Sequence, residues 1–317
     1  MPSVSVVIPS YNRAALLREA IASVLAQTFA DIEIIVVDDG STDGTGDVVA
    51  EFSRDSRIRY IAQMNAGVSA ARNTGIDAAT GALVAFLDSD DLWVPDHLAR
   101  LVAALEQTPD AMFAFANFRF IGDDEEAAAY NRSFAHSVGR FLERAFVRAG
   151  DGVRLSGANL LQTLFEIGFP FRIQGSMFRR SFLESWGLRF DPRISYTEEA
   201  QLVMEAALRG RCAFVDDPGV LIRRHDENLG DRCYEGKISA SYKHRIARMK
   251  AVFDGASLSR GERRALRGSM AQMGDYVMRE RAARGGWGQR VLAAFEAVRD
   301  VPCIASVKCA VKLLLGR

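Results

Sequence analysis

The chain has 317 residues, of which 49% are hydrophobic and 25% charged, and its formal net charge is zero. This composition is typical of a globular protein that buries a sizeable core as one large domain or as one domain with an appended piece. No stretch approaches the run of about eighteen apolar residues that a membrane-spanning helix needs.

The cysteines and the N-terminus indicate an intracellular location. The four cysteines form no CxxC pair and no spacing typical of a zinc site; they are Cys212, Cys233, Cys303 and Cys309. Free thiols of this kind fit the reducing cytosol, and the N-terminal residues lack the charged and apolar regions of a signal peptide. We therefore expect a cytoplasmic protein.

The first ninety residues alternate between predicted strands and predicted helices. Residues 4–9 form an almost continuous β-branched run, which is typical of a strand buried on both faces of a parallel sheet. Apolar residues then recur at helical spacing from Leu16 to Leu25. Repeated alternation of this kind favours βαβ units with right-handed crossovers on a parallel sheet. The further strands are expected at 32–37, 58–61 and 83–87, and the further helices at about 46–52 and 68–79.

The pattern beyond residue 90 is less regular. Residues 121–154 mix acids, aromatics and arginines without clean periodicity, so we expect an insertion or a mobile segment there. Residues 236–317 are expected to be entirely helical, with two apolar stripes that face a core, from Ile238 to Phe253 and from Leu266 to Val277. Between these parts we expect helices at about 95–107 and 197–208, and strands at 112–120, 169–178 and 212–222.

Charge is distributed unevenly between the two parts of the chain. Residues 236–317 contain 17 Lys and Arg against 6 Asp and Glu, a net charge of +11, so residues 1–235 carry −11. A basic segment can meet an anionic partner such as a membrane surface or a phosphorylated lipid. The last segment, from Ile304 to Arg317, is basic and amphipathic and could lie in a membrane interface. A solvated basic face that docks on its own domain explains the same pattern equally well.

Polar residues follow three of the predicted strands, in the loops at 9–13, 38–45 and 88–91. Because the carboxyl ends of parallel strands lie at one edge of a sheet, these loops are expected to assemble one site. Asp88, Asp90 and Asp91 would repel one another there unless a cation lies between them, and their hard oxygen ligands suit Mg²⁺ or Mn²⁺. The alternative is that Ser89 or Asp91 caps a helix beginning near residue 95, for which one side chain would suffice.

The loop at 38–45 indicates nucleotide binding, although a plain turn with a helix cap is the alternative. Asp39 can accept a hydrogen bond from a base N–H group, and Tyr11 can stack on a base or ribose. No G-x-G-x-x-G follows the first strand and no P-loop sequence occurs, which disfavours a dinucleotide cofactor and a P-loop nucleotide site.

Four motifs in order resemble those of the family 2 glycosyltransferases, which have the GT-A fold. The resemblance covers about residues 3–225. The motifs are VSVVIPSYNR at 4–13, VDDGSTD at 37–43, N-x-G at 65–67 followed by ARN-x-G at 71–75, and FLDSDDLW at 86–93. One motif alone would be weak evidence, whereas four at the family's spacing are specific. The implied fold is a Rossmann-like, mainly parallel sheet flanked by helices, with a helical C-terminal extension.

The resemblance implies a nucleotide-diphosphate sugar as donor, most often UDP-linked. Pro9, Tyr11 and Arg13 would surround the nucleoside, and Asp39 would accept from the base. Arg72 would lie near the phosphates or the acids of the metal site. These residues belong to an implied nucleotide-binding part at about 1–120, within a catalytic domain at 1–235 whose acceptor part is about 121–235 and which precedes the basic helical extension at 236–317.

The resemblance also implies a metal site. Asp88-Ser89-Asp90 matches the family's DxD motif, with Asp90 as the direct ligand of Mn²⁺ or Mg²⁺ and Asp88 and Ser89 directed towards ribose or metal. His225 follows a predicted strand where some members place a further metal ligand. A structural or solvent-facing histidine is the alternative.

The family takes its catalytic base from an acidic pair, usually Glu-Asp, that opens a helix. Here the pair is Glu198-Glu199, and Glu199 falls at the catalytic position with one methylene more than the usual Asp. This departure leaves Glu198 as a second candidate, and both acids could simply stabilise the helix N-terminus. A base at this position would deprotonate the acceptor hydroxyl, while a cation and an arginine stabilise the departing diphosphate, with inversion at the anomeric carbon.

The implied function is transfer of a single sugar to a glycan or lipid-linked acceptor, in surface-polysaccharide synthesis. The Q-x-x-R-W signature of processive polysaccharide synthases is missing after Gln174, which favours single transfer. Two other functions stay open: a sugar-nucleotide nucleotidyltransferase, and a catalytically silent module that binds nucleotide sugars. The sugar and the acceptor are not encoded in these motifs, because acceptor pockets lie in variable loops.

Overall fold

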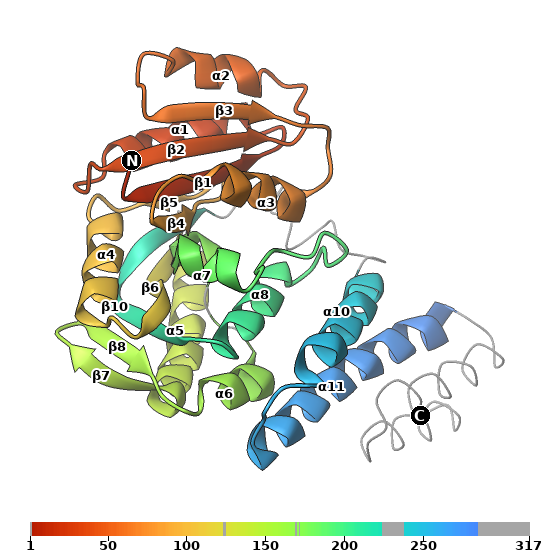
Figure 1. The fold of residues 1–317 in the computed structure, drawn as a ribbon. Coiled ribbons are helices and arrows are strands. Elements are labelled where there is room, and N and C mark those ends of the chain that lie inside the picture. Colours follow the sequence, from red (N-terminus) through yellow and green to blue (C-terminus); the bar gives the residue numbers. More distant parts are fainter. Residues whose placement is uncertain (1, 123–124, 169, 171, 224–237, 285–317) are drawn as a thin grey trace. The chain divides into compact units, whose positions relative to one another are not determined.

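The computed structural model describes residues 2–122, 125–168, 170, 172–223 and 238–284 (Figure 1). These residues form two compact units. Of the described residues, the first unit contains those up to Leu160, those from 170 to Pro192 and Leu202–Arg223, and the second contains Leu161–Gly168, Arg193–Gln201 and Ile238–Arg284. The predicted boundary at residue 235 falls outside the described residues and stays a prediction.

The first unit is built on one mixed sheet (Figure 1). Its strands run in the order β3-β2-β1-β4-β9-β6-β10-β8-β7, and β5 pairs with β10. Strands β1, β2, β3, β4, β6 and β10 point the same way, since β9, between β4 and β6, is antiparallel to both of these neighbours. The strands are β1 (Val4–Ser10), β2 (Ile32–Asp38), β3 (Ile58–Ala62), β4 (Leu83–Phe86), β5 (Leu92–Trp93), β6 (Ala111–Ile121), β7 (Phe146–Gly150), β8 (Val153–Ser156), β9 (Ser176–Arg179) and β10 (Arg211–Arg223).

The expected βαβ order of the first ninety residues is confirmed. β1 pairs in parallel with β2 on one side and with β4 on the other. Every residue of β1 is buried, which explains its continuous apolar run. The helices of this unit are α1 (Ala14–Leu25), α2 (Thr45–Glu51), α3 (Val68–Ala78), α4 (His97–Gln107), α5 (Glu125–Ala145), α7 (Arg180–Ser185) and most of α8 (Glu198–Ala207).

One glycine sets the distance between α3 and the sheet. A Cβ atom on Gly75 would lie 2.2 Å from a methyl carbon of Val7, so no larger residue fits there without displacement. α3 can therefore pack closely on β1 and β2, which brings Arg72 to the end of these strands. The opposite face of β1 contributes Val6 and Ile8 to a core that includes α1.

The expectation for residues 121–154 is wrong. Glu125–Ala145 form helix α5, of 21 residues, and it is followed by the hairpin strands β7 and β8. β8 also pairs with β10, which lies more than fifty residues further along the chain. Local periodicity cannot reveal a pairing between strands so far apart. The predicted strand at 169–178 is also shorter than expected: a 3₁₀ turn, η1, occupies Ile173–Gly175 and only Ser176–Arg179 enter the sheet.

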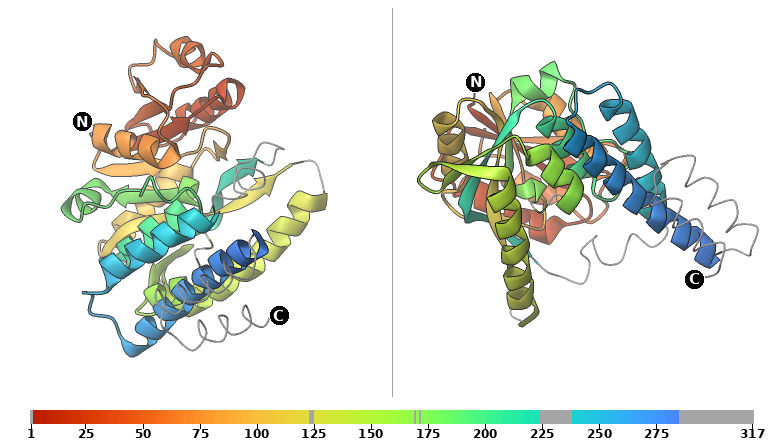
Figure 2. Two further views of the ribbon diagram at one scale, coloured as in Figure 1. Left: turned by 90° about the vertical axis from the view of Figure 1, so that its right-hand side faces the viewer. Right: turned by 90° about the horizontal axis from the view of Figure 1, so that it is seen from below.

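The second unit is helical where it is described. α6 (Leu160–Ile167), α10 (Ile238–Phe253) and α11 (Arg260–Arg284) supply its helices, and α10 and α11 lie side by side (Figure 2). Met249 and Phe253 of α10 are buried, as are Leu266 and Met270 of α11, so both apolar stripes are core-facing as expected. Among the residues that the structure describes, no helix has the length and apolarity to cross a bilayer.

Candidate functional site

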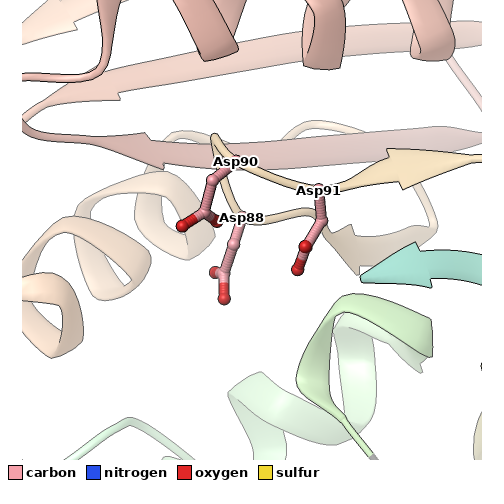
Figure 3. A group of neighbouring side chains, drawn as sticks. All are labelled: Asp88, Asp90 and Asp91. Atoms are coloured by element: carbon pink, nitrogen blue, oxygen red, sulfur yellow. The ribbon is translucent and has the colours of Figure 1, made fainter. Parts of the chain in front are cut away.

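Three carboxylates lie together where β4 ends (Figure 3). The amide of Leu87 donates a hydrogen bond to the carbonyl of Val7 in β1, 3.0 Å away. The loop that carries the three acids therefore begins directly after the last residue bonded to β1. Asp88, Asp90 and Asp91 each offer one oxygen, and these oxygens lie within 4.8 Å of one another. The three acids therefore lie close together, as the sequence predicts, and their role as one site stays a prediction.

Asp91 is held from two distant parts of the chain. Its side chain accepts from the Arg223 amide (3.0 Å) through one oxygen and from the Gln174 side-chain amide (2.8 Å) through the other. Burial, followed by the charges of Asp90 and Asp88, raises the pKa of Asp91 well above its usual value, although both hydrogen bonds act in the opposite direction. A cation beside this carboxylate would favour its ionised form.

The alternative role of this loop as a helix cap is excluded. The next helix, α4, begins at His97, and its N-cap residue is Asp96 rather than Ser89 or Asp91. The two carboxylate oxygens of Asp91 instead bind the end of β10 and the η1 turn. The three acids therefore have no part in starting α4.

A buried arginine stands beside the acids. The guanidinium of Arg72, on α3, donates to Asp88 at 2.8 Å, and only 3% of Arg72 is exposed. Its central carbon lies 5.2 Å from the ring centroid of Phe190. Asn73 fixes Phe190 by two hydrogen bonds, one to its carbonyl (2.8 Å) and one from its amide (2.9 Å). Within the ARN motif, Arg72 thus places a guanidinium group next to the carboxylates, and Asn73 holds the Phe190 ring that packs against this guanidinium.

Asp39, at the end of β2, organises the loop that leads into α3. Its carboxylate accepts from the Gln63 side chain (2.7 Å) and from the amides of Ala66 (2.9 Å) and Gly67 (2.8 Å). A carboxylate has about four acceptor positions, so one is left for a donor such as a base N–H. The side chain is almost fully buried, with 3% of Asp39 exposed.

The loops after β1 and β2 are bonded to each other. The Asn12 amide donates to the Ser41 hydroxyl (2.9 Å), and the Thr42 amide donates to the Asn12 side chain (2.8 Å). Asn12 adopts a positive φ of 51°, which turns the chain towards α1. Of the expected nucleoside contacts, Pro9 is buried and Tyr11 is 50% exposed beside this junction. The aromatic face of Tyr11 is therefore accessible to a ligand.

The donor set of the carboxylate loop fits a hard divalent cation. It consists only of oxygen atoms, from Asp88, Asp90 and Asp91, at mutual distances that one ion can bridge. Arg72 compensates part of the negative charge through Asp88. His225, the further ligand considered from the sequence, lies outside the described residues.

The two glutamates lie in the second unit. Glu198 and Glu199 form the first turn of α8, where acids are favoured by the helix dipole. Glu198 is 7% exposed, whereas Glu199 is half-buried and therefore more accessible to a substrate. Thr197, directly before them, has a positive φ of 61°.

Sequence reasoning missed Gln174 and Arg223 as parts of this site. They lie 83 and 132 residues from Asp91, and no local pattern links them to it. Arg223 also donates to the Glu19 carboxylate (2.8 Å), which ties the end of β10 to α1. The only signal in the sequence was that Arg223 ends a predicted strand and that Gln174 is a polar residue within another. The order of the strands in the sheet was needed to show that both lie beside Asp91.

The mixed sheet with acids at its carboxyl edge defines an α/β protein with a candidate cation site, and comparison with known sequences identifies the family. Residues 5–184 match the family described as Glycosyl transferase family 2. This is more than half of the chain, so the chain belongs to glycosyl transferase family 2. Its fold is the GT-A fold, as the four motifs predicted.

Curated relatives agree with this assignment. The uncharacterized glycosyltransferase EpsJ of Bacillus subtilis is 31% identical over 72% of this chain and 62% of its own length. Succinoglycan biosynthesis protein ExoO of Rhizobium meliloti is 33% identical over 70% and 60%, respectively. The Escherichia coli enzyme WfgD, named a UDP-Glc:alpha-D-GlcNAc-diphosphoundecaprenol beta-1,3-glucosyltransferase, is 39% identical over 38% and 47%. The chain thus spans less than two thirds of the length of these relatives.

Solved structures share the fold at low sequence identity. TarS 1-349 of S. aureus, solved in complex with UDP-GlcNAc, is 17% identical with a TM-score of 0.62, and the match covers 99% of this chain and 92% of that one. The mannosyltransferase PcManGT of Pyrobaculum calidifontis, solved with GDP-Man and Mn²⁺, is 19% identical with a TM-score of 0.58, covering 100% and 88%. At these identities the likeness establishes the fold.

Proposed function

We propose that this chain is an inverting, metal-dependent glycosyltransferase. It moves one sugar from a nucleotide-diphosphate sugar, UDP-linked, to a hydroxyl group of a glycan or lipid-linked acceptor. The observation that carries the proposal is the cluster of Asp88, Asp90 and Asp91 beside Arg72, at the carboxyl edge of a sheet of glycosyl transferase family 2.

The loops of the first unit would bind the donor. Tyr11 presents an exposed ring for stacking on the nucleoside, with Pro9 and Arg13 beside it, and Asp39 keeps an acceptor position for the base. Asp88 and Ser89 lie at the next strand end, towards ribose and diphosphate. UDP as the nucleotide is supported by WfgD and by the TarS complex, whose names specify UDP-linked sugars.

The residues divide the chemistry between leaving group and nucleophile. Asp90 and Asp88 would hold Mn²⁺ or Mg²⁺, which when bound offsets the charge of a diphosphate. Arg72 adds a fixed positive charge to the same region. Glu199, with Glu198 as the alternative, accepts the acceptor's hydroxyl proton while the oxygen bonds to the anomeric carbon and the bond to the diphosphate breaks. One such displacement inverts the anomeric centre.

The names of the relatives support a role in polysaccharide synthesis. ExoO is named for succinoglycan biosynthesis, and WfgD for a lipid-diphosphate acceptor. A lipid-linked acceptor would place the protein at the inner face of the membrane. The basic residues of α11 support such contact, because exposed arginines there can meet anionic lipid; they are Arg260, Arg263, Arg264 and Arg267.

A panel of donors tests the proposal. The full chain is incubated with Mn²⁺ and UDP-glucose, UDP-GlcNAc or GDP-mannose, and the released nucleoside diphosphate is measured. We expect release from one donor and a loss of about 10³-fold in Asp90→Ala, because several kcal/mol of leaving-group stabilisation disappear. Asp110→Ala, which removes an exposed acid before β6, is the matched control.

Three other results would contradict the proposal. Formation of pyrophosphate from a nucleoside triphosphate and a sugar phosphate would indicate the nucleotidyltransferase, which the family match disfavours. Metal-dependent binding of a donor without turnover would indicate a silent binding module. Retention of the β or α configuration of the donor in the product, read by NMR, would contradict inversion.

A further inference from the structure

Helix α10 binds the segment that leads into the two glutamates. The amide of Tyr196 donates to the Ser241 hydroxyl (3.0 Å), and that hydroxyl donates in turn to the Tyr196 carbonyl (3.0 Å). One turn further along α10, a ring nitrogen of His244 lies 3.1 Å from the Arg193 carbonyl. Residues of one face of α10 therefore fix the backbone of 193–196, and all of them belong to the second unit.

Arg245 of α10 binds Thr197, the residue that directly precedes α8. Its guanidinium donates to the Thr197 hydroxyl at 2.6 Å, and that hydroxyl donates to the Tyr196 carbonyl at 2.6 Å. Thr197 needs this support because its φ of 61° lies in the left-handed region, which a β-branched residue adopts at a cost. The carbonyl of Thr197 also accepts the Gln201 amide of α8 at 3.3 Å.

Arg245 is a buried cation with anionic and phenolic neighbours. It is 7% exposed, and burial lowers the pKa of its guanidinium from the usual value, while Tyr242, Glu199 and Tyr196 act to raise it. Glu199 is thus one of the groups whose charge favours the ionised guanidinium of Arg245. Burying a guanidinium is unfavourable unless it is bonded and paired, so its position is tied to these groups.

We propose that Arg245 is a positioning residue for the catalytic base: it fixes the Tyr196–Thr197 turn that directly precedes Glu198 and Glu199, and its positive charge acts on Glu199. The inference rests on the proposed function, since Glu199 is the base only if the chain transfers sugars. A helix downstream of the family 2 match would thereby support the proposed base within the second unit. A positive charge next to a carboxylate favours its ionised form, the form that can accept a proton.

The pH profile of kcat/KM tests the proposal, with nucleoside diphosphate release measured for UDP-glucose, UDP-GlcNAc and GDP-mannose in the presence of Mn²⁺. In Arg245→Met, loss of the charge makes Glu199 harder to ionise, so the acidic limb moves to higher pH by about one unit. We expect kcat to fall about tenfold while KM for the donor stays unchanged. Arg245→Lys keeps the charge, so its acidic limb should lie close to that of wild type. Lys243→Met, on the exposed side of α10, should give the wild-type profile.

The outcomes separate this inference from the proposed function. Full activity in Glu199→Gln overturns the proposed base, whatever Arg245 does. Loss of activity in Glu199→Gln together with a wild-type acidic limb in Arg245→Met overturns the positioning role alone. If Arg245→Met does not fold, Thr197→Val replaces it, because it removes the hydroxyl that accepts from Arg245. An unchanged kcat in that variant overturns the proposal.

A second readout does not depend on turnover. Melting temperatures are compared in a cycle of wild type, Arg245→Met, Glu199→Gln and the double variant. We expect Arg245→Met to lower the melting temperature less in the Glu199→Gln background, where its charged neighbour is already gone. Equal losses in the two backgrounds would show that the two side chains do not interact, and would overturn the proposal.

Discussion

The donor loops of the first unit and the acidic turn of the second unit are built in different ways. Asp39 and Asp88 stand directly at the ends of β2 and β4, two strands that are each bonded to β1. Glu199 stands instead in the first turn of a helix whose preceding turn is held by α10, more than forty residues downstream. The parallel strands position the first group through backbone bonds, whereas side-chain contacts position the second.

This difference predicts where the two groups tolerate change. A strand end is fixed by a continuous ladder, so substitutions near Asp88 act mainly through charge and metal affinity. The turn before Glu199 depends on single contacts from Ser241 and Arg245, and one of them can be removed without touching the glutamates. Two substitutions test these groups directly, and a third tests a carboxylate of β2 that belongs to neither group.

The largest effect is expected on the base side, in Glu199→Gln. The variant keeps the size of the side chain but cannot accept a proton, so we expect kcat to fall about 10²- to 10⁴-fold with little change in donor affinity. Release of nucleoside diphosphate with acceptor present measures this. Glu198→Gln is the matched control, because it changes the adjacent, more buried acid. A larger loss in the control would make Glu198 the base.

A smaller effect is expected on the donor side, in Gln174→Met. The substitution removes the amide that donates to Asp91 at 2.8 Å but preserves the approximate volume. Groups that orient carboxylates at a metal site affect affinity by about 10- to 100-fold, so the Mn²⁺ concentration for half-maximal release should rise about tenfold. Gln107→Met, at the exposed end of α4, serves as control. An unchanged Mn²⁺ requirement would show that Asp91 needs no such support.

The smallest expected effect concerns acid stability of the first unit. Burial raises the pKa of Glu33, but hydrogen bonds from Ser5, Thr80 and Arg59 outweigh it and lower the pKa from 4.5 to about 2. The folded state therefore binds this proton less readily than the unfolded chain. The stabilisation is present above pH 4.5 and is lost as the pH falls towards 2. After allowance for solvent screening it amounts to about 2 kcal/mol.

Urea unfolding between pH 5 and pH 2 measures this contribution. In Glu33→Gln the part of the pH dependence that comes from Glu33 should disappear, while the unfolding of wild type retains it. Glu51→Gln, at an exposed ion pair with Arg18, is the control and should leave the slope nearly unchanged. A slope in Glu33→Gln equal to that of wild type would exclude Glu33 as an acid-sensitive group.

Much of the fold was predictable because its signals are local. The runs of apolar residues at 4–9, 32–37 and 83–87 became β1, β2 and β4 within one residue or so at each end. In the segment at 121–154 the signal of α5 was present but was missed: its buried residues Val138, Phe141, Leu142 and Ala145 recur at helical spacing among many polar residues. Strand β8 has only four residues and is recognised by its pairing with β7 and β10. Strand pairing over such distances leaves little trace in the periodicity of either strand.

By itself the sequence determined the family, the parallel order of the first strands and the carboxylates that follow them, because strand periodicity and motif spacing are properties of short stretches. Tertiary structure alone decided which groups support those residues: Gln174 and Arg223 on Asp91, Asn73 on Phe190 and Arg245 on the turn before Glu199. These contacts join residues far apart in the chain, and a contact of that kind depends on packing geometry rather than on any local pattern.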